Sequence, residues 1–454
     1  MHPEPHAELL IRNAGHLVVD TSYEIPGGWV AVRDGAVVAV GAPGDEPTAD
    51  RVLDAGGRLV TPGLVNTHHH IYQNLTRSFA PAIQGSLFDW LTTLYPVWSA
   101  LDEEASYVSS YVGMAELLLG GCTTSSDHLY VHPRPGLVDA QIKAATDIGF
   151  RFHATRGSMT RSVDDGGLPP REVVQDQDTV LADSERLVGA YHQRGPHAMV
   201  QVALAPCSPF SVTRELMVAT AELAERLDVR LHTHLAEDHD EDTYCLETYG
   251  CRPVEYFESV GWMSDRSWVA HCIFPDEAET ARLAAAGVGV AHCPSSNMLI
   301  GNGTARVRAM RDLGLPVGLG CDGSASTDHA SLWLEARTAL LLARFTGGPG
   351  ALTSRDVLDV ATRGSARCLG RDDIGHLRPG ASADLVVWDT SEVALAGALT
   401  DPVEAWLRCG PSRAWSTVVA GRTLVEEGVP LLPGLPDALR DHRRIAGRLQ
   451  AVAV

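Results

Sequence analysis

The sequence is poor in positive charge and has almost no lysine. Its 36 Lys and Arg residues are outnumbered by 57 Asp and Glu residues, which gives a formal net charge of −21. Lys143 is the only lysine. A surface of this sign repels a phosphate backbone, so we expect no nucleic-acid partner.

Several other features are missing as well. No uninterrupted apolar run reaches the ~18 residues of a membrane span, and the N-terminal segment MHPEPHAELL lacks the basic and apolar regions of a secretion signal. The nine cysteines include no CxxC pair and lie mostly in apolar stretches, which indicates reduced thiols rather than a disulfide framework. These absences predict a cytoplasmic protein without a membrane partner.

The chain has 454 residues, 45% of them hydrophobic, which is enough for two domains or for one large α/β barrel with additions. Residues 8–60 resemble short strands, and Asp34-Gly35 between alternating apolar residues predicts a hairpin. From about residue 57, short apolar runs alternate with helical stretches. Eight of these apolar runs end near Asn66, Asp127, Thr155, Ala205, His234, His271, His292 and Cys321. After about residue 370 the sequence again resembles short strands.

Eight strand-helix units predict a TIM (β/α)₈ barrel. We therefore expect a catalytic barrel over residues 60–372 and a small β-sandwich domain built from both chain termini, residues 1–59 and 373–454. A second hairpin is expected at Val419-Ala420-Gly421-Arg422.

The most specific local motif is PGLVNTHHH, where His68 and His70 follow an apolar run. Alternate residues of an extended strand point to the same side, so this pair can hold one metal ion while His69 points elsewhere. Taken alone, the motif also suits histidines that cap a strand through hydrogen bonds.

Three further strand ends carry chemically suitable side chains. The run VRLHTHLAE supplies His232, His234 and Glu237, and a carboxylate just beyond a metal ligand suits a proton shuttle. His271 ends SWVAH, and Asp322 follows PVGLGC. A buried aspartate is unfavourable unless it is paired or bound to a cation. All these residues are expected at the same end of the barrel, where barrel enzymes assemble their active sites.

In order along the chain, PGLVNTHHH, HTHLAE, AHC, AHCPSSN, GCDGSAS and GHLRPGASADLVVWD resemble the amidohydrolase superfamily, in particular its aminohydrolase (deaminase) branch. The resemblance covers essentially the whole chain. It implies His68, His70, His234 and Asp322 as metal ligands, Glu237 as acid and base, Asp322 also as a base, and His271 as the group that polarises the attacking water.

The resemblance also implies how many metal ions are bound. Binuclear members of the superfamily bridge two ions with a carboxylated lysine at the end of strand four, where this chain has MVQVALAPCSPF and no lysine. We therefore expect one divalent ion. Three imidazoles and one carboxylate suit Zn²⁺, and Fe²⁺ accepts the same set.

Within the branch, GGCTTSSDHLY, RFHATRGSM and ALAPCSPFSV are most similar to 8-oxoguanine deaminases. Guanine deaminases of this fold carry an Arg-Phe pair where Ala203 and Leu204 stand here, which disfavours guanine. The expected reaction is conversion of 8-oxoguanine to urate and ammonia. Isoxanthopterin deamination, and amino- or chlorohydrolysis of s-triazines, remain alternatives on the same site. A non-enzymatic ring sensor is a further alternative, disfavoured by the complete catalytic set.

Four residues are candidate contacts to the small N-heterocyclic substrate. Gln73 could bind a ring carbonyl and N–H, or be a solvated loop residue. Arg156 could pair with a substrate oxygen, or form a salt bridge at the rim. Trp90 could cover the ring face, or belong to the core. Cys207 lies at the end of strand four and could equally be an inert buried thiol. We expect the enzyme to form a homo-oligomer.

Overall fold

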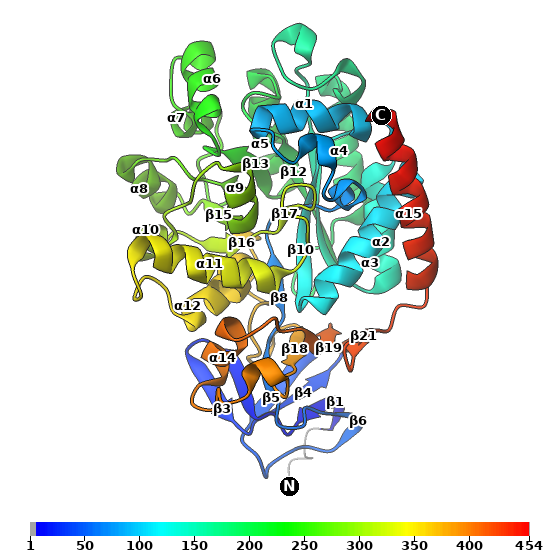
Figure 1. Cartoon of the computed structure of the whole chain (residues 1–454), viewed down its shortest axis with the longest axis vertical. Helices are drawn as coiled ribbons and strands as arrows, with labels where there is room; N and C mark the ends of the chain where they lie inside the picture. Colours follow the sequence, from blue (N-terminus) through cyan, green and yellow to red (C-terminus); the bar gives the residue numbers. More distant parts are fainter. Residues whose placement is uncertain (1–5, 454) are drawn as a thin grey trace.

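The computed structural model describes residues 6–453 and places a closed barrel beside two β-sheets (Figure 1). The barrel consists of parallel strands in the order β10-β11-β12-β13-β14-β15-β16-β8. The strands are β8 (Leu64–Asn66), β10 (Cys122–Leu129), β11 (Arg151–Ser158), β12 (Val200–Pro206), β13 (Leu231–Leu235), β14 (Ser267–His271), β15 (Gly289–His292) and β16 (Val317–Leu319). The predicted TIM barrel is confirmed, because each predicted strand end lies at or near the end of one of these strands.

Helices follow the strands and cover the outside of the barrel (Figure 1). Several begin at a side-chain cap: Asp102, Thr213 and Asp276 each accept a backbone N–H from the first turn of their helix. The helices are α1 (Leu87–Trp98), α2 (Glu103–Leu119), α3 (Leu137–Ile148), α4 (Gln177–Tyr191), α5 (Arg214–Leu227), α6 (His239–Tyr249), α7 (Pro253–Ser259), α8 (Glu277–Ala285), α9 (Pro294–Ile300), α10 (Val307–Asp312), α11 (Leu332–Gly347), α12 (Ser354–Asp359) and α13 (Ser365–Cys368).

The interior of the barrel is apolar in one part and polar in another. Val65, Ala203, Trp268 and Ala291 form a buried apolar cluster with residues of the segment that follows α12. Polar side chains gather at the carboxyl ends of the strands; β10, for example, is buried along its whole length although most of its residues are polar. Buried polar groups need partners, so this end of the barrel is where a site is expected.

The two sheets are built from both ends of the chain. One has the order β5-β4-β1-β6 and the other β21-β20-β19-β18-β7-β2-β3. Apolar residues from both sheets share one core, which confirms the predicted β-sandwich. Its strands are β1 (Ala7–Arg12), β2 (His16–Asp20), β3 (Tyr23–Pro26), β4 (Trp29–Arg33), β5 (Ala36–Gly41), β6 (Ala49–Asp54), β7 (Leu59–Pro62), β18 (Leu385–Trp388), β19 (Ala414–Val419), β20 (Arg422–Glu426) and β21 (Val429–Pro430).

Both predicted hairpins are present. Asp34 and Gly35 connect β4 and β5, and Ala420 and Gly421 connect β19 and β20. All four residues have positive φ, as a two-residue turn between twisted antiparallel strands requires.

The sheets and the barrel are joined by a buried ion pair. The Arg151 guanidinium on β11 donates to both carboxylate oxygens of Asp384, at 2.7 and 3.0 Å. Beyond the sheets, α14 (Pro402–Arg408) precedes β19, and the C-terminal helix α15 (Leu435–Gln450) runs back along the barrel beside α2 (Figure 1). The domain limits at residues 59/60 and 372/373 stay a prediction. Within residues 6–453, none of the helices combines the length and apolar character needed to cross a bilayer.

Candidate metal centre and active site

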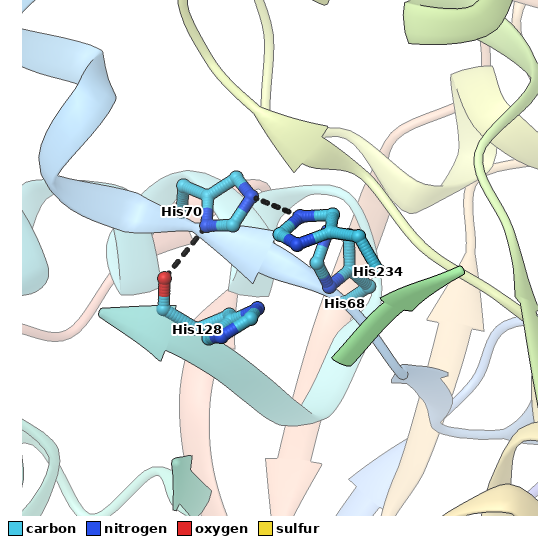
Figure 2. A group of neighbouring side chains, drawn as sticks. All are labelled: His68, His70, His128 and His234. Atoms are coloured by element: carbon cyan, nitrogen blue, oxygen red, sulfur yellow. Dashed lines mark hydrogen bonds between the residues drawn. The ribbon is translucent and has the colours of Figure 1, made fainter. Parts of the chain in front are cut away.

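Three histidines converge at the carboxyl end of the barrel, as predicted. His68 directly precedes β9 (His69–His70), which contains His70, and His234 lies on β13. Figure 2 shows the three rings turned toward one another, with His128 of β10 beside them. All three are buried.

A hydrogen bond fixes the tautomer of each of these rings. The Nδ1–H groups of His70 and His234 each donate to a carbonyl oxygen, which can only accept. The ring of His232 donates from Nδ1 to the carbonyl of Trp268, so its Nε2 must accept from Nδ1–H of His68. The three bonds are His68 Nδ1 to His232 Nε2 at 2.8 Å, His70 Nδ1 to the His128 carbonyl at 2.6 Å and His234 Nδ1 to the Cys207 carbonyl at 2.6 Å.

The Nε2 atoms therefore present bare lone pairs to a shared space. The Nε2 atoms of His70 and His234 are 3.2 Å apart, although neither carries a proton to share. Nε2 of His68 is buried and has no hydrogen-bond partner among the residues that the structure describes. Two facing lone pairs repel each other, and a cation between them removes the repulsion. The donor set therefore fits a metal ion.

Asp322 completes the donor set with an oxygen. Its Oδ1 lies 3.3 Å from Nε2 of His68 and 3.2 Å from Nε2 of His70. It occupies the short strand β17 (Asp322–Gly323), which pairs in parallel with β9. Its Oδ1 therefore faces the same space as the Nε2 lone pairs of His68 and His70, and a cation there would pair with this buried carboxyl group.

Two overlapping groups of buried side chains have the spacing of metal ligands. The first contains His68, His234, His271 and Asp322, and the second His68, His70, His128 and His234. The expected ligands His68, His70, His234 and Asp322 are all found within these groups. His128 lies beside the candidate ligands, and its Nε2–H donates to the Ala205 carbonyl at 2.9 Å.

Glu237 and His271 lie next to this centre. Nε2 of His271 is 3.6 Å from Oε1 of Glu237 and 3.9 Å from Oδ2 of Asp322. Its Nδ1–H donates to Oδ1 of Asn297 at 2.8 Å, while Oε1 of Glu237 accepts from Asn302 at 3.0 Å. Burial and the charge of Asp322 raise the pKa of Glu237 well above its usual range, which favours a carboxyl that can give up a proton.

The backbone that carries these groups is strained. His271 and Asp322 both have positive φ, at 67° and 55°, which is uncommon for residues other than glycine. Such conformations concentrate at functional sites, where the surrounding structure enforces them.

A small cavity of about 30 Å³ opens onto these residues. Helix α1 supplies much of its apolar wall. The cavity is lined by His70, Leu87, Trp90, Leu91, Tyr95, Tyr130, Cys207, Ser208, Phe210, His234, Glu237, His271, Ile300, Asp322 and Ser326. The site therefore combines a donor set that fits a metal ion, a buried carboxyl group and a small, partly apolar cavity.

Two of the four expected substrate contacts line this cavity. Trp90 lies in the wall with its indole N–H donating to the Ala325 carbonyl at 3.2 Å. Cys207 also lines the cavity, but burial raises the pKa of its thiol to about 12. The thiol is therefore inert as a nucleophile.

Arg156 and Gln73 do not line the cavity. Arg156 was expected to contact substrate because of its place near a strand end. Its buried guanidinium instead donates to Asp183 and Gln175, both at 2.7 Å. The side chain therefore turns away from the site. Gln73, in the buried turn after His70, packs so closely on Gly323 that a Cβ there would lie 1.7 Å from its Oε1. Its amide lies behind Tyr130, 3.5 Å from that hydroxyl.

Sequence reasoning missed Tyr130 and Asn302. Tyr130 follows β10 directly and stands edge-on to His70, with ring centroids 4.9 Å apart; its place just after a barrel strand was a usable signal. Asn302 lies in the loop after α9, and no local pattern connects that loop to Glu237.

Comparisons with known proteins agree with this geometry. A sequence model described as the amidohydrolase family matches residues 59–423. The chain is 47% identical over 446 residues to 8-oxoguanine deaminase of Pseudomonas aeruginosa, covering 97% of this chain and 99% of that protein. It is 34% identical to an isoxanthopterin deaminase from an unknown prokaryotic organism, with 87% of each chain covered.

Among solved structures, the atrazine chlorohydrolase of Arthrobacter aurescens, complexed with zinc, superposes with a TM-score of 0.92. The two proteins are 34% identical, and the match covers 96% of this chain and 100% of that one.

Proposed function

The chain belongs to the amidohydrolase family, and we propose that it is a metal-dependent deaminase that hydrolyses 8-oxoguanine to urate and ammonia. The observation that carries this proposal is the convergence of three tautomer-fixed Nε2 lone pairs with Asp322, beside a buried Glu237 with a raised pKa. A hydrolase acting on C–N bonds needs these two elements, an activated water and a proton donor for the leaving amine.

We propose one divalent ion, Zn²⁺ in first place, with Fe²⁺ accepted by the same ligands. His68, His70, His234 and Asp322 would hold it. The only lysine, Lys143, lies on the barrel exterior, where its ammonium is paired with Asp147. No lysine is thus available to bridge a second ion.

When bound, such an ion acts as a Lewis acid that makes water acidic enough to attack at neutral pH. The residues of the chain then move the protons. The Asp322 carboxylate accepts a proton from the attacking water. Glu237 gives a proton to the ring nitrogen next to the amidine carbon, and His271, 3.6 Å from Glu237, stabilises the charge that develops on the new hydroxyl. Asp322 then passes the water proton to the exocyclic amine and the new hydroxyl gives its proton to Glu237, so that the C–N bond breaks, ammonia leaves and both carboxyl groups return to their starting states.

The choice of ring rests on two features. The first is the identity of 47% over nearly the whole chain to an 8-oxoguanine deaminase. The second is strand β12, where Ala203 and Leu204 stand in place of the Arg-Phe pair that guanine deaminases of this fold carry. An oxidised imidazole ring has an N–H at N7 and a carbonyl at C8 where guanine has a basic nitrogen and a C–H. A pocket that pairs with the first ring leaves polar groups unsatisfied with the second.

The experiment is turnover by zinc-loaded protein, scored for both products. We expect equimolar urate and ammonia from 8-oxoguanine, loss of turnover on chelation, and recovery when metal is returned. Ring opening without ammonia would rule out a deaminase. Turnover of isoxanthopterin or of an s-triazine in place of 8-oxoguanine would keep the mechanism and replace the substrate. A protein that binds no metal and turns over none of these rings would instead support the hypothesis of a non-enzymatic ring sensor.

A further inference from the structure

The catalytic carboxyl Glu237 is presented by a tight turn rather than by regular structure. Strand β13 ends at Leu235, Ala236 has a positive φ of 51°, and helix α6 is capped by Asp238. A left-handed alanine is unfavourable, so the turn needs support from its surroundings.

Part of this support comes from the loop that follows His271. The Ala236 carbonyl accepts the N–H groups of Ile273 and Phe274, at 2.8 and 3.1 Å, and the Leu235 carbonyl accepts that of Cys272 at 3.1 Å. The turn that carries Glu237 is thus held against the segment that carries His271.

The other side of the turn is held by Glu241. Its two carboxylate oxygens accept the backbone N–H groups of Ala236 and Glu237, at 3.0 and 2.9 Å. The residue is 1% exposed, and within residues 6–453 its side chain forms no ion pair and no other hydrogen bond. Burial raises its pKa to about 7, so placing this carboxyl here is unfavourable apart from the two bonds it makes.

The reach of Glu241 differs from ordinary helix capping. Glu241 is the third residue of α6, and a carboxyl at that position normally bonds the N–H of the capping residue itself. Helix α8 does this, because Glu279 accepts from the N–H of Asp276 at 2.8 Å. Glu241 instead reaches past Asp238 to the two preceding residues, so its bonds hold the turn and not only the helix end.

We propose that Glu241 is a positioning residue that fixes the turn carrying Glu237 and so aims the Glu237 carboxyl at its place between Asn302 and His271. The kinetic part of this inference rests on the proposed function; the structural part does not. A catalytic group displaced by about 1 Å can lose ~10²-fold in rate. The two hydrogen bonds that Glu241 makes to this turn should therefore affect the reaction rate.

The test uses Glu241→Gln in the full-length, metal-loaded protein. The amide keeps the shape but offers one acceptor oxygen, and its NH₂ opposes one of the two backbone N–H groups. We expect kcat to fall by about tenfold or more, with KM and metal content near the wild-type values. In a Glu237→Gln background the same change should cause no further loss, because the group being positioned is already absent. The matched control is Glu279→Gln, which removes the equivalent carboxyl from α8 and should leave kcat within about twofold, whatever its effect on thermal stability.

A crystal structure of the Glu241→Gln protein provides a readout that needs no substrate. We expect the Glu237 carboxyl to have left its 3.0 Å contact with Asn302. An undisplaced Glu237, or equal losses of kcat in both backgrounds, would overturn the inference. If Glu241→Gln does not fold, Glu241→Asp keeps the charge but is too short to reach both N–H groups and should show the same displacement. Wild-type protein without turnover of 8-oxoguanine refutes the proposed function, while the displacement still decides the role of Glu241.

Discussion

Replacing His232 by leucine should weaken metal binding although His232 is not a ligand. The ring is fully buried, accepts Nδ1–H of His68 at 2.8 Å, donates to the Trp268 carbonyl at 2.9 Å, and stacks on the Trp268 indole with centroids 4.4 Å apart. Leucine keeps the apolar packing and removes the acceptor. Nδ1–H of His68 is then buried without a partner, which costs about 1–3 kcal/mol.

The His68 ring can relieve this penalty by moving its proton to Nε2, where Oδ1 of Asp322 lies 3.3 Å away. That tautomer blocks the lone pair that faces the metal. Loss of such an outer partner typically weakens metal affinity ~10–100-fold, or about 1.4–2.8 kcal/mol. We expect His232→Leu to fall in this range and His232→Gln, whose amide offers an acceptor and a donor, to lose less.

The assay is competition between the metal-free protein and a chromophoric chelator for Zn²⁺. The control is His153→Leu. The ring nitrogens of this buried barrel histidine have no hydrogen-bond partner within residues 6–453, so its loss should leave the zinc affinity unchanged. A folded His232→Leu protein with the wild-type zinc Kd would refute the reasoning, because the tautomer of His68 would then not depend on His232.

Three further outcomes are expected. Alanine at any one of the three ligand histidines should abolish stoichiometric zinc, measured by elemental analysis, while circular dichroism stays native; full occupancy would remove that residue from the ligand set. Glu237→Gln should retain zinc and lose at least ~10²-fold in kcat, and simultaneous loss of metal would make it a ligand instead. Burial raises the pKa of Glu335 from 4.5 to about 8, so this carboxyl binds its proton more tightly in the folded than in the unfolded state. The free energy of unfolding should therefore fall as pH rises from about 4.5 to 8, and Glu335→Gln should flatten this fall in denaturant titrations; an unchanged slope would contradict the assignment.

The barrel and the convergence of the candidate metal ligands at one end of it were predictable because local patterns encode them. Several barrel strands are short apolar runs that end at or near a polar residue, and parallel barrel strands bring those ends together. The spacing of His68 and His70 follows from the two-residue period of an extended strand. These inferences require no knowledge of side-chain direction beyond that period.

The substrate wall and the supporting contacts were less accessible, because they depend on where a side chain turns. Arg156 lies on β11 and not just beyond the strand, and its bonds to Asp183 and Gln175 depend on the path of helix α4 and of the loop before it, which the sequence does not reveal. The path of α15 was likewise not foreseen. Only the tertiary structure shows that His442 on this helix meets Asn74, with Nε2 2.8 Å from Oδ1.

The most direct test of the central claim compares kcat/KM of the zinc-loaded protein for 8-oxoguanine, guanine and isoxanthopterin, each followed by ammonia release and ultraviolet absorbance. The two purines share the pyrimidinone edge and differ in the imidazole ring, so the comparison isolates recognition of the oxidised ring. A site that pairs with N7–H and the C8 carbonyl should favour 8-oxoguanine over guanine by about 10⁴-fold or more. Equal kcat/KM for the two purines would contradict the account, and a preference for isoxanthopterin would assign the same catalytic residues to a pterin.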